Sequence, residues 1–195
     1  MYKHIKHTFQ LRFFKIEILH KKQILKRRPN YGGFMETIYL AGGCFWGVEK
    51  FFKQFRGVIF TEVGYANGDG EEANYEDLWK SGHAETVKIE YDPSIIDLEK
   101  LLEYYFMIID PLSVNKQGPD AGRQYRTGIY YISNEQVNSI DKMVKKVEDE
   151  LGSKLAVEVE PIRNYKRAEE YHQKYLDKHP TGYCHIRNNM FHLED

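Results

Sequence analysis

The chain has 195 residues, which suits one domain with appendages, and 42% of them are hydrophobic, enough for an ordinary folded core. Its formal net charge is -1, but residues 1–34 hold nine Lys or Arg and one acidic residue, so the remainder has 19 basic and 28 acidic side chains. This acidic remainder gives no electrostatic reason to bind nucleic acid or an anionic membrane, and no apolar run is long enough to cross a bilayer.

The first 34 residues differ in composition from the rest of the chain and end in a linker rich in Pro and Gly. Charges interrupt their apolar run, and no small-residue cleavage site comes after it, so a secretory signal is not indicated. We expect residues 1–34 to be a basic extension outside the fold, as translation from upstream of Met35 would produce; a functional basic anchor is the alternative. Residues 35–186 would then form the domain and residues 187–195 a C-terminal tail.

The periodicity of apolar residues predicts nine elements in the rest of the chain. β-Branched, aromatic or alternating stretches predict strands over 37–40, 58–63, 84–91, 127–132 and 156–160, and helical spacing predicts helices over 48–55, 98–106, 134–151 and 165–179, the second capped by Asp97. Residues 109–125 have no periodicity and form a long loop, which in a compact domain is usually functional. This order predicts an α+β sandwich in which helices pack on an antiparallel or mixed sheet.

The first strand and helix are joined by Ala41-Gly42-Gly43-Cys44-Phe45-Trp46-Gly47. Its glycines let the chain turn sharply and bring the backbone close to a ligand. Cys44 therefore lies at or near the first helical turn, where free backbone N–H groups and the helix dipole favour a thiolate. A buried structural cysteine is the alternative, but bulky aromatic residues beside a cysteine at such a turn favour a nucleophile.

Five motifs make the chain similar to a known family. Gly43–Gly47, Gly64-Tyr65-Ala66, Gly82–Glu85, Gln117–Asp120 and Gln124-Tyr125-Arg126 occur in the order and rough spacing of peptide methionine sulfoxide reductase A. The resemblance covers about residues 36–186 and implies an α+β fold, a two-layer sandwich with a ferredoxin-like plait. The chain departs from the family pattern at Ile109, Leu112 and Asn67, none of which has a chemical role in the family motifs.

The resemblance implies the roles of two residues in sulfoxide reduction. Cys44 matches the nucleophile that attacks the sulfoxide sulfur and becomes a sulfenic acid. Glu85 matches the proton donor to the sulfoxide oxygen, so burial must raise its pKa from an ordinary value of about 4.3. A solvent-facing glutamate like Glu90 is the alternative that position alone would suggest.

Further residues match the groups that hold the substrate. Tyr65 and Tyr125 match two tyrosines that donate hydrogen bonds to the sulfoxide oxygen, which suits uncharged phenols in a closed apolar site. Phe45 and Trp46 match the wall around the methyl group, a role compatible with core packing. Asp120 matches an acid that helps to hold the substrate or a water molecule, with a simple turn residue as the alternative.

The second cysteine, Cys184, lies in a glycine-hinged tail where the family often carries a recycling cysteine. The resemblance implies that it attacks the sulfenic acid, releases water and leaves a Cys44–Cys184 disulfide for thioredoxin to reduce. The alternative is an inert thiol. Since only two cysteines occur, a relay through a third is ruled out.

The resemblance thus implies a thioredoxin-dependent peptide-methionine (S)-S-oxide reductase that acts on free or protein-bound methionine-S-sulfoxide and repairs oxidised proteins. We expect a cytoplasmic monomer without cofactor or metal that binds neither nucleic acid nor membrane. One competing interpretation is a thiol hydrolase or acyltransferase in which His83 serves Cys44 as base. Another is a metal or haem module built from Cys184, His185, His172 and His179.

Overall fold

The computed structural model describes residues 34–193. The predicted extension, residues 1–34, therefore lies outside the described residues except for its last position. The helices and strands, in chain order, are β1 (Glu36–Gly42), α2 (Phe45–Lys53), β2 (Val58–Ala66), α3 (Leu78–Ser81), β3 (Ala84–Tyr91), α4 (Leu98–Ile108), β4 (Lys116–Gln117), β5 (Asp120–Ala121), β6 (Thr127–Tyr131), α5 (Asn134–Leu151), β7 (Glu158–Pro161), β8 (Lys166–Arg167) and α6 (Tyr175–Lys178). None of these helices is long and apolar enough to span a membrane.

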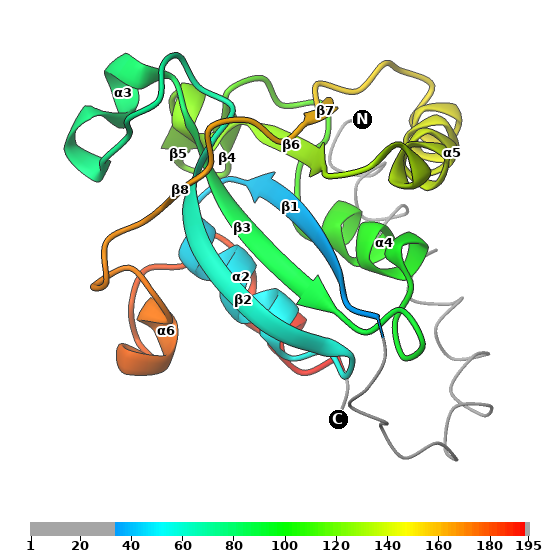
Figure 1. The fold of residues 1–195 in the computed structure, drawn as a ribbon, viewed down its shortest axis with the longest axis horizontal. Helices are drawn as coiled ribbons and strands as arrows, with labels where there is room; N and C mark the ends of the chain where they lie inside the picture. The colour runs from blue at the N-terminus through cyan, green and yellow to red at the C-terminus, as the bar shows by residue number, and fades with distance from the viewer. Residues whose placement is uncertain (1–33, 194–195) are drawn as a thin grey trace.

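A six-stranded sheet forms the centre of the fold, with the order β7-β6-β1-β3-β2-β8 (Figure 1). Its middle has the chain order β1-α2-β2-β3-α4-β6, and each neighbouring pair among these four strands is antiparallel. That order is the ferredoxin-like plait. β7 adds to one edge in parallel with β6, which makes the sheet mixed. The predicted α+β class and plait are confirmed.

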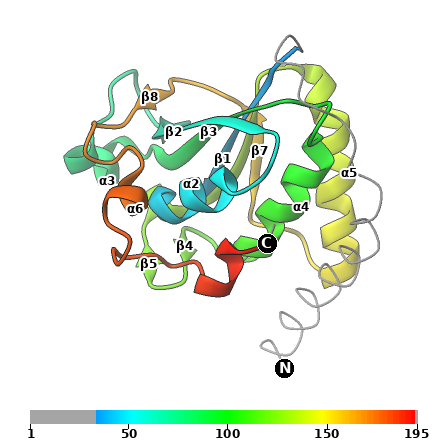
Figure 2. The ribbon, with the colours of Figure 1, turned by 90° about the horizontal axis from the view of Figure 1, so that it is seen from below.

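Helices α2 and α4 lie on the same face of the sheet, and α5 packs beside α4 (Figure 2). The predicted apolar face of the first helix is buried there, because Val48, Phe51 and Phe52 are fully inaccessible to solvent. Burying each such side chain contributes about 1.5–3 kcal/mol, so this face fixes α2 and the turn before it. Asp97 caps α4 as predicted, since its carboxylate accepts a hydrogen bond from the N–H of Lys100 at 2.8 Å.

The opposite face of the sheet is covered by chain from the C-terminal part, not by a helix. Ala41, Ala66 and Ala84 provide small side chains there, and Tyr165 packs over them. The approach is close, because a Cβ atom at Gly64 would lie 2.5 Å from the Tyr165 ring. A bare backbone at this position lets the C-terminal segment lie directly on the sheet, on the face away from α2.

The predicted helix over 165–179 is wrong. The segment instead forms β8, turns and the short helix α6, and Lys174 has a left-handed φ of +52° that a continuous helix does not allow. The Gln173 side chain makes the hydrogen bonds to β2 that a neighbouring strand would make. It accepts one from the N–H of Val63 and donates one to the Val63 carbonyl. The apolar spacing resembles a helix, but long-range contacts with β2 determine the structure.

The packed part of the chain continues past residue 186. Met190 is buried, and its carbonyl accepts a hydrogen bond from the side chain of Gln54 at the end of α2. The oxygen of the same amide accepts a hydrogen bond from the N–H of Leu193. Residues 188–193 therefore lie against α2, the helix that begins directly after Cys44.

Candidate active site

Cys44 stands at the turn between β1 and α2, as its N-cap residue. Gly43 before it has a φ of +85°, and a Cβ atom there would lie 2.6 Å from Cβ of Gln117 in the long loop. Glycine is therefore required both by the backbone conformation and by the packed loop. The turn places the thiol, 6% exposed, at the wall of a cavity of about 90 Å³. A cavity of this size admits a few water-sized groups.

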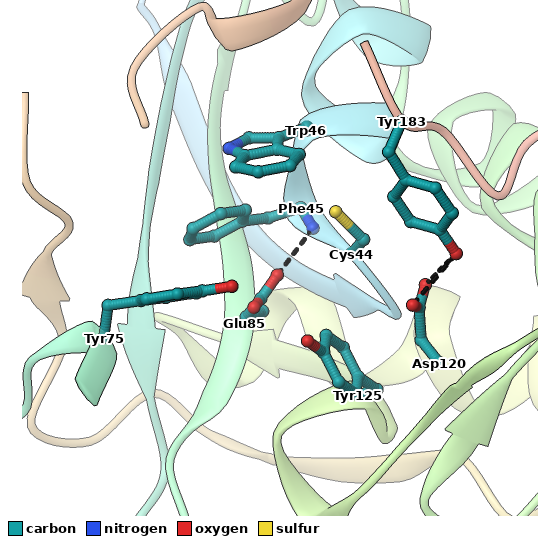
Figure 3. A pocket seen from close by; sticks show the side chains of 8 residues that line it. All are labelled: Cys44, Phe45, Trp46, Tyr75, Glu85, Asp120, Tyr125 and Tyr183. Carbon is teal, nitrogen blue, oxygen red and sulfur yellow. Dashed lines mark hydrogen bonds between the residues drawn. The ribbon is translucent and has the colours of Figure 1, made fainter. Parts of the chain in front are cut away.

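Eight side chains line this cavity, and Figure 3 shows how they surround it: Cys44, Phe45, Trp46, Tyr75, Glu85, Asp120, Tyr125 and Tyr183. Six of them, all except Tyr75 and Tyr183, were predicted as site residues from the sequence. The other two predicted residues, Tyr65 and Cys184, do not line the cavity.

Glu85 lies on the cavity wall, near the start of β3, and is 2% exposed. Its carboxyl accepts a hydrogen bond from the backbone N–H of Phe45 at 3.0 Å, which joins it to the first turn of α2. Burial raises the pKa of Glu85 to about 8, and the charge of Asp120 acts in the same direction against the Phe45 N–H. At neutral pH the group is therefore mostly a protonated acid.

The Cys44 thiol is subject to the same effect of burial. Burial raises its pKa well above the ordinary value, and a charged Glu85 would raise it further. The N–H of Trp46 at the helix start lowers the pKa, as expected from the sequence, but by less than burial raises it. Burial thus acts against the thiolate that the helix start favours, and it favours the protonated form of both Cys44 and Glu85.

Three tyrosines line the cavity. The hydroxyls of Tyr75 and Tyr125 point toward the Glu85 carboxyl, whereas the Tyr183 hydroxyl lies against Asp120 (Figure 3). Burial raises the pKa of Tyr75 and of Tyr125, so both phenols remain hydrogen-bond donors at neutral pH. Tyr75 was not predicted, because it stands in a polar stretch between motifs.

Tyr65 is not a wall of the cavity, which corrects the role implied by its motif. It is fully buried opposite Glu85 in the strand register and stacks on Phe45 with ring centroids 5.9 Å apart. Its hydroxyl donates a hydrogen bond to Glu169, and the other oxygen of Glu169 accepts one from the N–H of Tyr75 at 3.1 Å. Tyr65 therefore supports the position of Tyr75 from behind.

The aromatic wall is held by His172, a candidate metal ligand in one interpretation of the sequence. Trp46 donates its indole N–H to Nδ1 of His172 at 3.1 Å and stacks on Tyr175 at 3.8 Å. His172 is 1% exposed and also contacts the rings of Phe45 and Tyr75. Burial lowers the pKa of His172, so the neutral ring stays an acceptor for the indole.

Asp120 and Tyr183 close the cavity on the side away from Tyr75 (Figure 3). The Tyr183 hydroxyl donates to the Asp120 carboxylate, 2.9 Å from each oxygen. This contact joins the long loop after α4 to the C-terminal tail, so Asp120 is more than the simple turn residue of the alternative interpretation.

Cys184 comes directly after Tyr183 in the tail and, like Cys44, is a free thiol. Its sulfur lies against the first turn of α2, because a Cβ atom at Gly47 would be 2.8 Å from it. Cys44 and Gly47 are three residues apart and therefore neighbours on that turn. The fold thus brings the two cysteines, 140 positions apart in sequence, to one end of one helix.

The competing interpretations lack the groups they need. His83 is fully buried and does not line the cavity, so it has no access to Cys44 as a base. Within residues 34–193, no group of three or more His, Cys, Asp or Glu side chains is arranged to hold a metal ion. The histidines of the metal interpretation serve separate contacts.

Comparisons with known proteins identify the family of the chain. A family model described as peptide methionine sulfoxide reductase matches residues 36–194. A relative from Lachnoclostridium phytofermentans, named peptide methionine sulfoxide reductase MsrA, is 53% identical over 158 residues, which are 80% of this chain and 95% of that protein.

Solved structures are similar over most of the fold. Reduced Mxr1 from Saccharomyces cerevisiae has a TM-score of 0.74 at 36% identity, covering 78% of this chain and 91% of that chain. Methionine sulfoxide reductase A of Corynebacterium diphtheriae has a TM-score of 0.73 at 32% identity, covering 84% and 82%. Mxr1 in complex with Trx2 has a TM-score of 0.53 at 26% identity, covering 77% and 91%.

Proposed function

The chain belongs to the peptide methionine sulfoxide reductase family, and on this premise we propose how its own residues carry out the reaction. It is an oxidoreductase that reduces methionine-S-sulfoxide to methionine. The observation that carries the assignment is one cavity that joins a buried thiol, a carboxylic acid with a pKa near 8 and two phenol hydroxyls.

In the first step the sulfoxide tip enters the cavity with its methyl group against Phe45 and Trp46. Tyr75 and Tyr125 donate hydrogen bonds to the sulfoxide oxygen, which builds negative charge as the S–O bond weakens. Glu85 gives that oxygen its proton, a task for which an acid with a pKa close to the working pH is best suited.

The step balances within the site. The Cys44 sulfur attacks the sulfoxide sulfur and forms a transient S–S bond. The protonated oxygen then passes from the substrate sulfur to the Cys44 sulfur, and the S–S bond breaks as methionine leaves, so Cys44 becomes a sulfenic acid. The proton that Glu85 gives to the oxygen is replaced by the Cys44 thiol proton, so the pair ends with the same charge. A raised Cys44 pKa therefore fits the mechanism, because the thiol loses its proton only when the sulfoxide draws one from Glu85.

Recycling then uses the second cysteine. Cys184 attacks the sulfenic sulfur, a disulfide to Cys44 forms, and the hydroxyl leaves as water with the proton of the Cys184 thiol. Thioredoxin reduces this disulfide and restores two thiols. The yeast relative Mxr1, solved with the thioredoxin Trx2, supports this partner.

The surroundings of the enzyme can be inferred from the same chemistry. The two cysteines are free thiols that must be reduced in each cycle, so we place the protein in the cytoplasm, where thiols are kept reduced. All eight cavity residues come from one chain, so a monomer suffices.

The reaction uses the sulfoxide tip alone, which admits free methionine sulfoxide as well as oxidised proteins as substrates.

The test is reduction of a methionine-S-sulfoxide peptide by wild type, Cys44→Ser and Cys184→Ser, with dithiothreitol or thioredoxin as reductant. We expect Cys44→Ser to be inactive with both reductants. Cys184→Ser should retain the dithiothreitol reaction and lose the thioredoxin reaction. Wild-type thioredoxin activity in Cys184→Ser would refute the recycling role, and activity in Cys44→Ser would refute the nucleophile.

A further inference from the structure

Cys184 is fixed by the residues on both sides of it. Tyr183 donates its hydroxyl to Asp120 in the long loop. On the other side, Nε2 of His185 lies 3.0 Å from the carbonyl oxygen of Gly42, two residues before Cys44. Only the second contact reaches the catalytic turn itself.

The geometry determines the protonation of the His185 ring. A carbonyl oxygen only accepts hydrogen bonds, so Nε2 carries the proton and donates it to Gly42. The side chain is 4% exposed, and burial lowers its pKa, which keeps the ring neutral. Nδ1 is then a bare acceptor, 4.0 Å from the Asp120 carboxylate and without a hydrogen-bond partner among the residues that the structure describes.

A buried nitrogen without a hydrogen-bond partner lowers the stability of the fold, and an apolar side chain at the same position would not have this effect. His185 packs against the turn, because a Cβ atom at Gly43 would lie 3.1 Å from its Nε2, and a leucine would fill much of the same space. What the imidazole adds is a donor that reaches the Gly42 carbonyl. The position of this donor suggests a role beyond filling the space.

We propose that His185 is the positioning residue of the recycling step: its hydrogen bond to Gly42 holds Cys184 against the first turn of α2, where its sulfur reaches the sulfenic acid on Cys44. The inference rests on the proposed recycling role of Cys184. His185 exchanges no proton with the reacting atoms; the bonds formed and broken are those between Cys184 and the sulfenic acid. It acts by fixing the distance between the two sulfurs.

The test measures how Cys44 sulfenic acid divides between two fates. Reduced enzyme without reductant receives one equivalent of methionine-S-sulfoxide peptide together with a series of concentrations of a 1,3-dione, which traps sulfenic acids irreversibly. Mass spectrometry then gives the fractions of trapped protein and of Cys44–Cys184 disulfide. The trap concentration that captures half of the protein reports the rate of disulfide formation, whatever the rate of the first step.

Two variants form a matched pair. The amide of His185→Gln reaches the place of Nε2 and donates to Gly42, whereas the shorter amide of His185→Asn does not. We expect His185→Asn to be half-trapped at a concentration about three- to tenfold below wild type, the effect of one lost neutral hydrogen bond. His185→Gln should stay within about twofold of wild type by the same reasoning. His192→Asn, at an exposed histidine of the same tail, should match wild type.

The rate of methionine release shows whether His185 positions Cys184 for recycling or instead positions the nucleophile Cys44. The proposal requires release to be equal in wild type and both His185 variants. Equal partition in His185→Asn and wild type would overturn it, as would slower methionine release in either His185 variant than in wild type. If wild type itself is trapped completely at every concentration, as Cys184→Ser must be, the recycling role of Cys184 fails instead.

A measurement on wild type covers the case in which the variants do not fold. With ¹⁵N-labelled histidine, the proposal expects one slowly exchanging ring proton of His185 on Nε2 at pH 7. A proton on Nδ1, or a rapidly exchanging ring, would contradict the anchor to Gly42.

Discussion

Replacing Glu85 with Gln tests both the stability and the chemistry of the buried acid. The variant keeps the shape and an oxygen for the Phe45 N–H, but it cannot ionise. A carboxyl whose pKa rises from 4.5 in the unfolded chain to about 8 in the fold costs about 5 kcal/mol of stability once both states are ionised. The Gln variant is free of this cost.

The sign of the effect is set by proton binding. Below pH 4.5 the carboxyl is neutral in both states and costs nothing. Between 4.5 and about 8 the unfolded chain has released the proton that the folded chain keeps, so wild-type stability falls by about 1.4 kcal/mol per pH unit. Above pH 8 the loss is complete. The stability of Glu85→Gln relative to wild type should therefore rise with pH and then level off.

Urea unfolding at pH 5.5, 7 and 8.5 measures this difference, with Glu90→Gln on the same strand as a partly exposed control. We expect the advantage of Glu85→Gln to grow by roughly 3 kcal/mol across the series, while methionine release falls by about 10²–10⁴ for want of an acid. A stability difference between Glu85→Gln and wild type that does not change with pH would refute the raised pKa of the buried Glu85. Full methionine release by Glu85→Gln would refute the role of Glu85 as proton donor. Wild-type release should also decline above pH 8, where Glu85 loses its proton.

Three further substitutions test other parts of the site. Tyr75→Phe should lower single-turnover methionine release by about 10²-fold, since one hydroxyl to the developing charge is lost, whereas Tyr65→Phe should lower it by less than about tenfold; the reverse order would contradict the cavity assignment. His172→Leu leaves the indole N–H without its acceptor, so urea unfolding should show a loss of about 1–3 kcal/mol and steady-state kinetics a raised KM; an unchanged KM would mean that the indole does not bind substrate. Gly47→Ala places a methyl 2.8 Å from the Cys184 sulfur, and it should slow the thioredoxin-supported reaction more than the dithiothreitol-supported one; equal slowing would argue against contact with the tail.

Local patterns predicted most of the fold. The strand over 84–91 and the helix over 134–151 have the predicted bounds, because alternation and helical periodicity there agree with burial in the final structure. The segment 165–179 has helical spacing as well, yet the prediction of a helix there is wrong. Its side chains are used for contacts with β2 and Trp46, which periodicity within the segment does not report.

The sequence predicted the site residues that lie in a motif at the end of a secondary-structure element, and it missed those whose position depends on long-range contacts. Cys44 follows the end of one strand, and Glu85 lies near the start of another. Tyr65 packs behind the cavity wall whereas Tyr75 faces the cavity, and both donate hydrogen bonds to Glu169, about a hundred residues further along the chain. The proton on Cys44 likewise depends on burial by distant chain, which outweighs the local effect of the helix start.

Because the cavity is small, the rate at which a protein-bound sulfoxide is reduced depends on how far its segment can move out of the protein that carries it. Cys44 is 6% exposed, and the space before it holds only the tip of a side chain, so a sulfoxide must project from its own protein to reach the thiol. A sulfoxide packed inside a folded protein becomes a substrate only when its segment opens. Repair would then be fastest where oxidation has already loosened a structure, and slowest where a sulfoxide is tolerated without unfolding.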